Sequence, residues 1–198
     1  MKHILITSSH FQTTTWPGGT TTELFIFPTT ANYKDRNFQF RLSTATVEVN
    51  QSDFTLLNGF SRKLMILNGS VTLNHENHHS VQLNKFEVYS FEGDWKTSCM
   101  GKCTDFNLMT GGKLKGKLMG IALNKGEVTQ HLIRDNCNWL FIYVYFGNVS
   151  VEMNEEIISI DKGDLLVINQ ISAQNLQIQG IENSELVVAE ITNETLYL

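Results

Sequence analysis

The sequence predicts an all-β protein folded as two tandem antiparallel β-barrels, and three observations support this prediction. β-branched and aromatic residues are dense, only 2 prolines occur in the 198 residues, and Gly or Asn interrupts the apolar runs at short intervals, as in sandwiches and barrels. No segment keeps a helical period of apolar residues over three turns. One pattern of strand, turn and strand occurs twice along the chain.

Strands are expected where β-branched and aromatic residues are concentrated between turn-forming residues. The clearest candidates, in chain order, are Glu23–Phe27, Phe38–Val49, Arg62–Leu67, Ser70–Leu73, Trp139–Phe146, Val149–Val151 and Asp164–Ile168. Several of these follow one another after a short glycine-containing turn, which indicates antiparallel pairing.

The repeated pattern has a glycine turn at its centre. In the first copy Leu64–Leu73 leads through a polar gap to Val81–Val88, and in the second Ile142–Val151 leads to Ile158–Leu165. Each copy is interpreted as strand, glycine turn, strand, polar hairpin and strand. The glycines, Gly69 and Gly147, would supply the positive φ that a tight turn needs.

The repeat divides the chain into two domains. The segment Gly111–Lys117 is rich in Gly and Lys and is interpreted as a solvated linker between them. We therefore expect residues 1–112, which include the Trp-Pro-Gly-Gly segment, to form the first barrel and residues 113–198 the second.

Composition and charge exclude several classes of function. The net charge is -5 and the basic residues are scattered, so we expect no nucleic-acid partner. No run of about eighteen apolar residues exists and the N-terminus turns polar early, so we expect no membrane partner and a cytoplasmic location. An odd number of cysteines suits a reducing compartment; they are Cys99, Cys103 and Cys137. The sequence leaves the oligomeric state open, a homodimer included.

The stretch Ile158–Ile168, with the strand and glycine turn before it, resembles the cupin superfamily. The resemblance implies small antiparallel barrels, often paired (a bicupin), with the ligand site in the barrel interior. Metal-dependent cupins place two His and a Glu before the turn and a third His after it. The corresponding positions here hold Thr55, Leu57, Arg62 and Thr97 in the first barrel and Arg134, Asn136, Leu140 and Gln174 in the second. We therefore expect no metal and no other cofactor.

Three histidines lie close together in the polar gap after Leu73, at positions 75, 78 and 79. We interpret this gap as a solvated hairpin tip. A metal site is the weaker alternative, because Glu76 is the only acidic residue at a matching spacing.

The first half of the chain resembles the HutD/Ves family of bicupin proteins, which are associated with histidine utilisation and stress responses. The matching stretches are Trp16–Leu24, Phe40–Glu48, Phe54–Leu64, Gly93–Trp95 and Asp105–Met109. The match is strong over residues 12–110 and weak in the second barrel. The chain departs from the family at Pro17, near which the family more commonly has Asn.

A candidate ligand site follows from the first barrel. Alternation places Arg41, Ser43, Ala45 and Val47 on one strand face. Arg62 stands where metal-dependent cupins have a carboxylate, and there it would favour an anion. The equivalent Leu140 predicts a packed interior in the second barrel. The candidate ligand-binding residues are Trp16, Thr20, Thr21, Arg41, Ser43, Arg62, Asp105 and Asn107.

Each candidate has a structural alternative. The arginines could form internal ion pairs with Glu23 or Asp105, the threonines could form an edge strand, and Trp16 could be a lid or a core residue. We expect binding of a small carboxylate, with a regulatory role that the resemblance would link to histidine breakdown. A metal-independent isomerase or epimerase is the second hypothesis, disfavoured because no His falls at the inward positions. A structural or partner-binding protein is the third.

Overall fold

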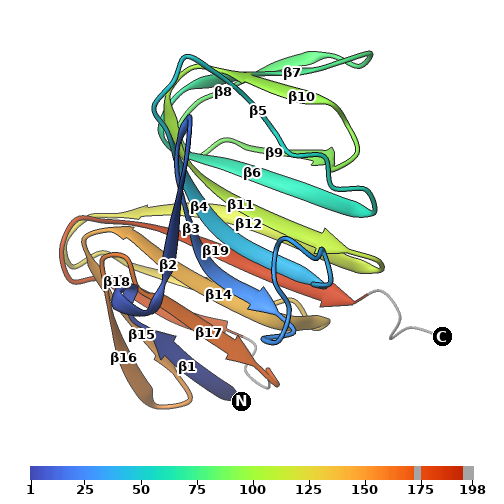
Figure 1. The fold of residues 1–198 in the computed structure, drawn as a ribbon. Coiled ribbons are helices and arrows are strands. Elements are labelled where there is room, and N and C mark those ends of the chain that lie inside the picture. Colours follow the sequence, from blue (N-terminus) through green and yellow to red (C-terminus); the bar gives the residue numbers. More distant parts are fainter. Residues whose placement is uncertain (172–174, 194–198) are drawn as a thin grey trace. The chain divides into compact units, whose positions relative to one another are not determined.

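The structure is a computed structural model that describes residues 1–171 and 175–193. Within them the chain consists of antiparallel strands and turns, and the helical structure is one 3-10 turn at Ser8–His10 (Figure 1). The predicted all-β class is therefore confirmed. Two compact units can be distinguished: residues Phe11–Gly116 form the first unit, and Met1–His10 with the chain from Lys117 onward form the second.

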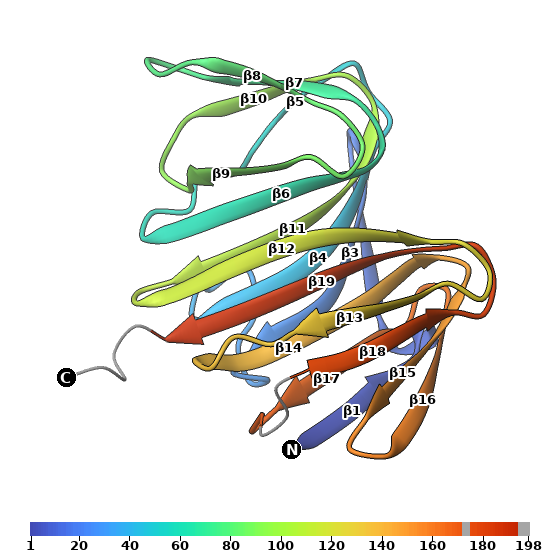
Figure 2. The ribbon, with the colours of Figure 1, turned by 180° about the vertical axis from the view of Figure 1, so that it is seen from behind.

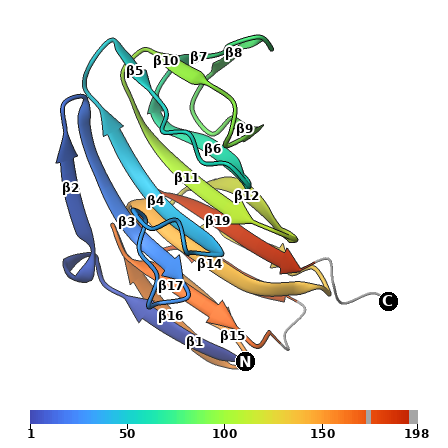
Figure 3. The ribbon, with the colours of Figure 1, turned by 45° about the vertical axis from the view of Figure 1, so that its right-hand side comes forward.

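The first unit contains a six-stranded and a four-stranded antiparallel sheet (Figure 3). The six-stranded sheet consists, in spatial order, of β2 (Gln12–Trp16), β3 (Gly19–Phe27), β4 (Phe40–Val47), β11 (Cys103–Gly111), β6 (Phe60–Gly69) and β9 (Val88–Glu92). The four-stranded sheet consists of β5 (Gln51–Asp53), β10 (Thr97–Met100), β7 (Val71–His75) and β8 (Ser80–Leu83).

The second unit is built from a five-stranded and a four-stranded sheet (Figure 2). The five-stranded sheet has the order β1 (Lys2–Ile6), β17 (Leu165–Asn169), β14 (Cys137–Phe146), β19 (Ser184–Asn193) and β12 (Leu114–Leu123). The other sheet has the order β13 (Val128–Leu132), β18 (Asn175–Gly180), β15 (Asn148–Met153) and β16 (Glu156–Asp161).

The N-terminal strand belongs to the second unit, whereas the division expected from the sequence groups residues 1–112 together. The reason is pairing: β1 lies antiparallel to β17, with Leu5 opposite Leu166. Leu5 also packs against the apolar core of the second unit. A strand remote in sequence thereby completes one edge of the five-stranded sheet.

The two central glycines occupy corresponding turns. Gly69 connects β6 to β7 with φ of 82°, and Gly147 connects β14 to β15 with φ of 78°. A Cβ at Gly69 would lie 2.5 Å from the backbone oxygen of Lys102, and one at Gly147 would collide with the backbone oxygen of Asn183. Both turns therefore need glycine for its positive φ and its lack of a side chain.

Each unit has its own apolar core. The core of the first unit includes Leu64, Ile66, Val71 and Leu73, with Phe91 beside them. The larger core of the second unit is formed by buried aliphatic side chains from both of its sheets. They come from alternate positions of the strands, as expected when each sheet turns one face inward.

None of the helical structure in residues 1–171 and 175–193 is long and apolar enough to cross a membrane.

Candidate functional site

A cavity of about 350 Å³ opens in the first unit. Its walls combine charged, hydroxyl and aromatic side chains. The lining residues are Thr14, Trp16, Thr21, Tyr33, Arg41, Ser43, Ala45, Val47, Ser52, Asp53, Phe54, Thr55, Arg62, Asp105, Asn107 and Met109.

Much of the polar wall comes from four neighbouring strands, β3, β4, β11 and β6. Side chains alternate along each strand, so residues two apart share the inner face. The registers set three rows across the sheet: Thr21, Ala45 and Asp105; Glu23, Ser43 and Asn107; and Arg41, Met109 and Arg62. Met109 thus separates the two arginines, whose strands lie about 10 Å apart at the usual strand spacing.

Arg41 is paired within the protein. Its Nε donates a hydrogen bond of 2.6 Å to Glu23 Oε2, and its Nη1 donates one of 3.0 Å to Ser43 Oγ. The Tyr33 ring centroid lies 4.5 Å from the Arg41 Cζ. The internal pair with Glu23, one of the two interpretations of Arg41 from the sequence, is the arrangement in the structure.

Arg62 is buried without an ion pair to any residue of the described chain, and its side chain makes one hydrogen bond, from Nη1 to Thr55 O at 3.2 Å. Its Nε has no hydrogen-bond partner. The Cζ lies 4.7 Å from the Phe54 ring centroid. Burial lowers the pKa of Arg62 to about 10, with Tyr33 and Asp105 opposing the shift, so the guanidinium stays charged at neutral pH.

Two buried acceptors face the same cavity from β11. Asp105 is 4% exposed and Asn107 6% exposed, and the Oδ1 of each lacks a hydrogen-bond partner among the described residues. Burial raises the pKa of Asp105 to about 7, although the charge of Arg62 acts in the opposite direction. A carboxyl group that titrates near neutrality therefore interacts electrostatically with a guanidinium that forms no ion pair among the described residues.

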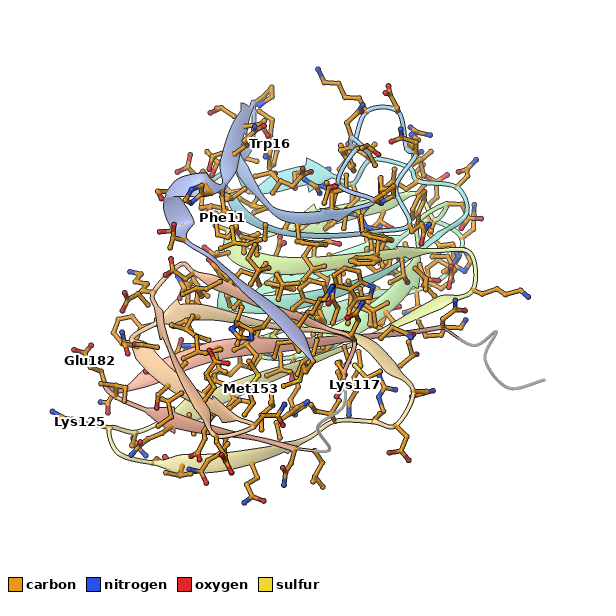
Figure 4. All side chains as sticks on the ribbon, turned by 90° about the horizontal axis from the view of Figure 1, so that it is seen from below. Phe11, Trp16, Lys117, Lys125, Met153 and Glu182 are labelled. Carbon is orange, nitrogen blue, oxygen red and sulfur yellow. The ribbon has the colours of Figure 1, made fainter. Side chains whose placement is uncertain are left out.

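The structure brings most of the predicted site residues together around this cavity, and Thr20 is the exception. Thr20 lies opposite Thr46 in the β3–β4 ladder, one position out of phase with the lining pair Thr21 and Ala45. Strand alternation therefore directs it to the other face. Trp16, near the tip of the β2–β3 hairpin (Figure 4), lines the cavity and packs against the core of the first unit.

Sequence reasoning identified Trp16 but missed the other two aromatic residues of the wall, Tyr33 and Phe54. Tyr33 lies in the loop between β3 and β4, and no periodic pattern marks it. Phe54 and Thr55 follow β5 directly; they belong to a stretch that resembles the family, but nothing in the residue pattern indicated that Phe54 contacts Arg62.

The positions that correspond to the metal ligands of metal-dependent cupins do not fit a metal here. Arg62 is a buried cation, which cannot ligate a metal ion, and Leu140 is a fully buried apolar residue. Gln174 lies outside the described residues. Within residues 1–171 and 175–193 no group of three or more His, Cys, Asp or Glu side chains is arranged to hold a metal ion.

The second unit repeats the framework with a different interior. Leu140 stands seven residues before Gly147, as Arg62 does before Gly69. By the same registers, Leu186 corresponds to Asp105 and Val188 to Asn107, and both are buried in the apolar core.

One buried carboxylate, Glu190, lies opposite Leu140 in the second unit. Its oxygens are 2.9 Å from His131 Nε2 and 2.5 Å from Arg134 Nε. Burial favours its protonated form, but these two partners outweigh burial and lower the pKa of Glu190. This carboxylate is satisfied by the protein, unlike Asp105.

The interpretation of the histidines as a solvated tip is wrong for His75, which is 2% exposed. Its ring contacts those of Tyr89, Phe91 and Trp95. The Thr97 hydroxyl donates to Trp95 O, so it accepts a hydrogen bond from His75 Nδ1 at 2.8 Å, and His75 Nε2 is left without a partner. Aromatic residues distant in sequence cover this end of the hairpin, which the local polar pattern does not indicate.

Comparison with solved structures shows the same fold in bacterial proteins. A conserved protein of unknown function from Pseudomonas aeruginosa PAO1 matches with a TM-score of 0.83 and 18% identity, covering 98% of this chain and 100% of that one. HutD from Pseudomonas fluorescens SBW25 gives a TM-score of 0.74 and 18% identity, with coverage of 98% and 100%. The bacterial pirin YhhW from Escherichia coli, in complex with nickel(II), gives 0.70 and 13%, with coverage of 97% and 100%.

A search of curated proteins finds no match for the sequence. The HutD family model, in contrast, matches residues 8–186. This match includes both halves of the repeat and the whole lining of the cavity, and the fold is that of cupin proteins. The protein therefore belongs to the HutD family.

Proposed function

We propose that this protein binds a small carboxylate metabolite in the cavity of its first unit, without a metal and in the cytoplasm. The observation that supports this most directly is Arg62, a buried guanidinium that lines the cavity with its Nε unpartnered and without an ion pair among the described residues. Buried charges are normally paired. A carboxylate ligand would form the missing ion pair and accept the free N–H.

Binding with a regulatory role fits this cavity better than catalysis. None of the described lining residues is a histidine, so the usual base of metal-free cupin isomerases is missing from the wall. Arg41 is already neutralised by Glu23, which leaves Arg62 as the recognition residue. The association of the family with histidine utilisation and stress makes acids from histidine breakdown suitable members of a first screen.

The test is a thermal-shift screen of small carboxylates followed by calorimetry, since a ligand that binds the native state raises the melting temperature. Arg62→Ala should weaken binding by about ten- to a hundredfold, the value of a charge-assisted hydrogen bond of about 1.5–3 kcal/mol. Arg62→Lys should recover only part of the loss, because the planar fork is missing.

Lys63→Ala is the matched control. Lys63 is the next residue on β6, its Nζ bonds Ser90 Oγ, and it does not line the cavity. The variant therefore removes one positive charge without touching the site, and its affinity should stay within about twofold of wild type, as expected for a half-buried charge outside the cavity. Unchanged affinity in a folded Arg62→Ala protein would contradict the proposal.

A further inference from the structure

The two unpartnered oxygens on β11 indicate which group the ligand carries in addition to its carboxylate. Asp105 Oδ1 and Asn107 Oδ1 come from neighbouring inward positions of one strand, about 7 Å apart along it, and neither accepts a hydrogen bond within the described chain. Buried acceptors without partners are costly. A carboxylate has only acceptor oxygens, so while Asp105 is ionised it can satisfy Arg62 but neither of these two atoms. Above the pKa of Asp105, a ligand that satisfies all three atoms therefore also carries a donor.

The charges around the cavity indicate what kind of donor this is. Arg41 and Glu23 neutralise each other. Arg62 and Asp105 remain as one cation and one anion within the cavity, and Asp53 adds a carboxylate at its exposed wall. With Asp105 ionised the site holds at least as much negative as positive charge. Such a site has no surplus cation for a dianion, but it matches a ligand with one charge of each sign.

We propose that the ligand is a zwitterion of the amino-acid type, a carboxylate that carries a protonated amino group. This inference rests on the carboxylate binding proposed above and deepens it. The ligand carboxylate accepts from Arg62 Nε, and its ammonium group donates to Asp105 Oδ1. Asn107 Oδ1 accepts a further N–H from the same ligand. The three unpartnered atoms of this wall, one donor and two acceptors, are then all satisfied.

The pH dependence of binding provides an independent readout. Burial raises the pKa of Asp105 to about 7, so the free protein loses this negative charge as the pH falls below that value. The neighbouring thiols do not titrate in this range, because burial and the charge of Asp105 raise the pKa of Cys99 to about 11 and that of Cys103 further. Affinity for a zwitterion should therefore decrease from pH 8 to pH 5, about tenfold for each unit below the pKa of Asp105.

The experiment compares amino acids with their deaminated partners by calorimetry at pH 8. The pairs are L-leucine and isocaproate, L-phenylalanine and hydrocinnamate, L-glutamine and glutaramate, and L-glutamate and glutarate. Within a pair the carboxylate and side chain are the same, and only the amino group differs. The best-binding amino acid should bind at least about tenfold more tightly than its partner, the usual value of a charge-assisted hydrogen bond.

Asp105→Asn should remove most of this advantage and the pH dependence, and it should leave the deaminated acid's affinity unchanged or increased. Asp94→Asn, in an exposed turn of the same unit outside the cavity, should preserve both. A deaminated acid that binds as tightly as its amino acid, or an N-acetyl amino acid that does so, would overturn the zwitterion while leaving carboxylate binding intact. If no carboxylate in the screen binds, the proposed function itself fails.

Discussion

Replacing Asp105 by Asn should stabilise the protein at neutral and alkaline pH. The pKa of Asp105 rises from an ordinary 3.8 to about 7 because the carboxyl is buried, with Arg62 offsetting only part of the effect. A carboxyl group whose pKa is raised in the folded state does not destabilise the protein below its pKa in the unfolded chain. As the pH rises from that value to the pKa in the folded protein, the unfolding free energy decreases progressively. At about 1.36 kcal/mol per pKa unit, the ionised carboxylate costs up to about 4 kcal/mol above pH 7.

The pH dependence of the stability difference between Asp105→Asn and wild type isolates the effect of Asp105 ionisation. An unpaired amide in Asn has its own desolvation penalty, but that penalty does not depend on pH. The gain in unfolding free energy from Asp105→Asn should therefore grow by about 3 kcal/mol between pH 5 and pH 8, the two units below pH 7 at about 1.36 kcal/mol each.

Urea unfolding at both pH values measures this gain, provided that the m-value is unchanged. Asp94→Asn is the control, since Asp94 is exposed and its replacement should change stability by less than about 0.5 kcal/mol at either pH. A variant whose gain is the same at pH 5 and pH 8, or that is less stable than wild type at pH 8, would refute the argument that Asp105 is held in the cavity against its own preference for water.

Two further predictions concern other parts of the first unit. Gly69→Ala should lower the unfolding free energy by about 2 kcal/mol or more, because the φ of Gly69 is 82° and the new Cβ would collide with a backbone oxygen. The control is Gly112→Ala, at φ of 63° with open space around it, which should cost about 1 kcal/mol. Equal losses in the two variants would contradict the steric argument. Burial, His79 and His78 lower the pKa of His75. Stability that is present above pH 6.5 should therefore be lost as the pH falls through the pKa of His75 in the folded protein. In His75→Phe the slope of unfolding free energy against pH below 6.5 should be smaller, and an unchanged slope would count against a buried neutral imidazole.

The strand framework could be predicted because local sequence patterns determine where strands and turns form. Alternation on β4 identified the face that carries Arg41, Ser43, Ala45 and Val47, and these residues line the cavity. The repeat around the two glycines gave corresponding turns in both units. In each case residues close in sequence determine the outcome, so that a period of two or a single positive φ is sufficient evidence.

The parts that could not be predicted depend on contacts between residues far apart in sequence. The place of β1 is set by pairing with β17, more than 150 residues away. The burial of His75 depends on Phe91 and Trp95, and the different states of the two arginines depend on whether Glu23 or a backbone oxygen reaches them. The sequence identified both arginines as candidates, but only the side-chain contacts in the structure show that Arg41 forms an ion pair and that Arg62, among the described residues, does not.

Because the two units have corresponding strands, the second unit shows how the same framework folds without the polar cavity. Where the second unit has Leu140, Leu186 and Val188, the first has groups that would rather be hydrated. The second unit forms a corresponding strand framework with apolar side chains at these positions, whereas buried polar atoms without partners lower the stability of the first unit. Local opening should therefore begin in the first unit. A ligand bound in the cavity would suppress that opening. Binding would therefore increase the local order of the first unit without any rearrangement of its strands.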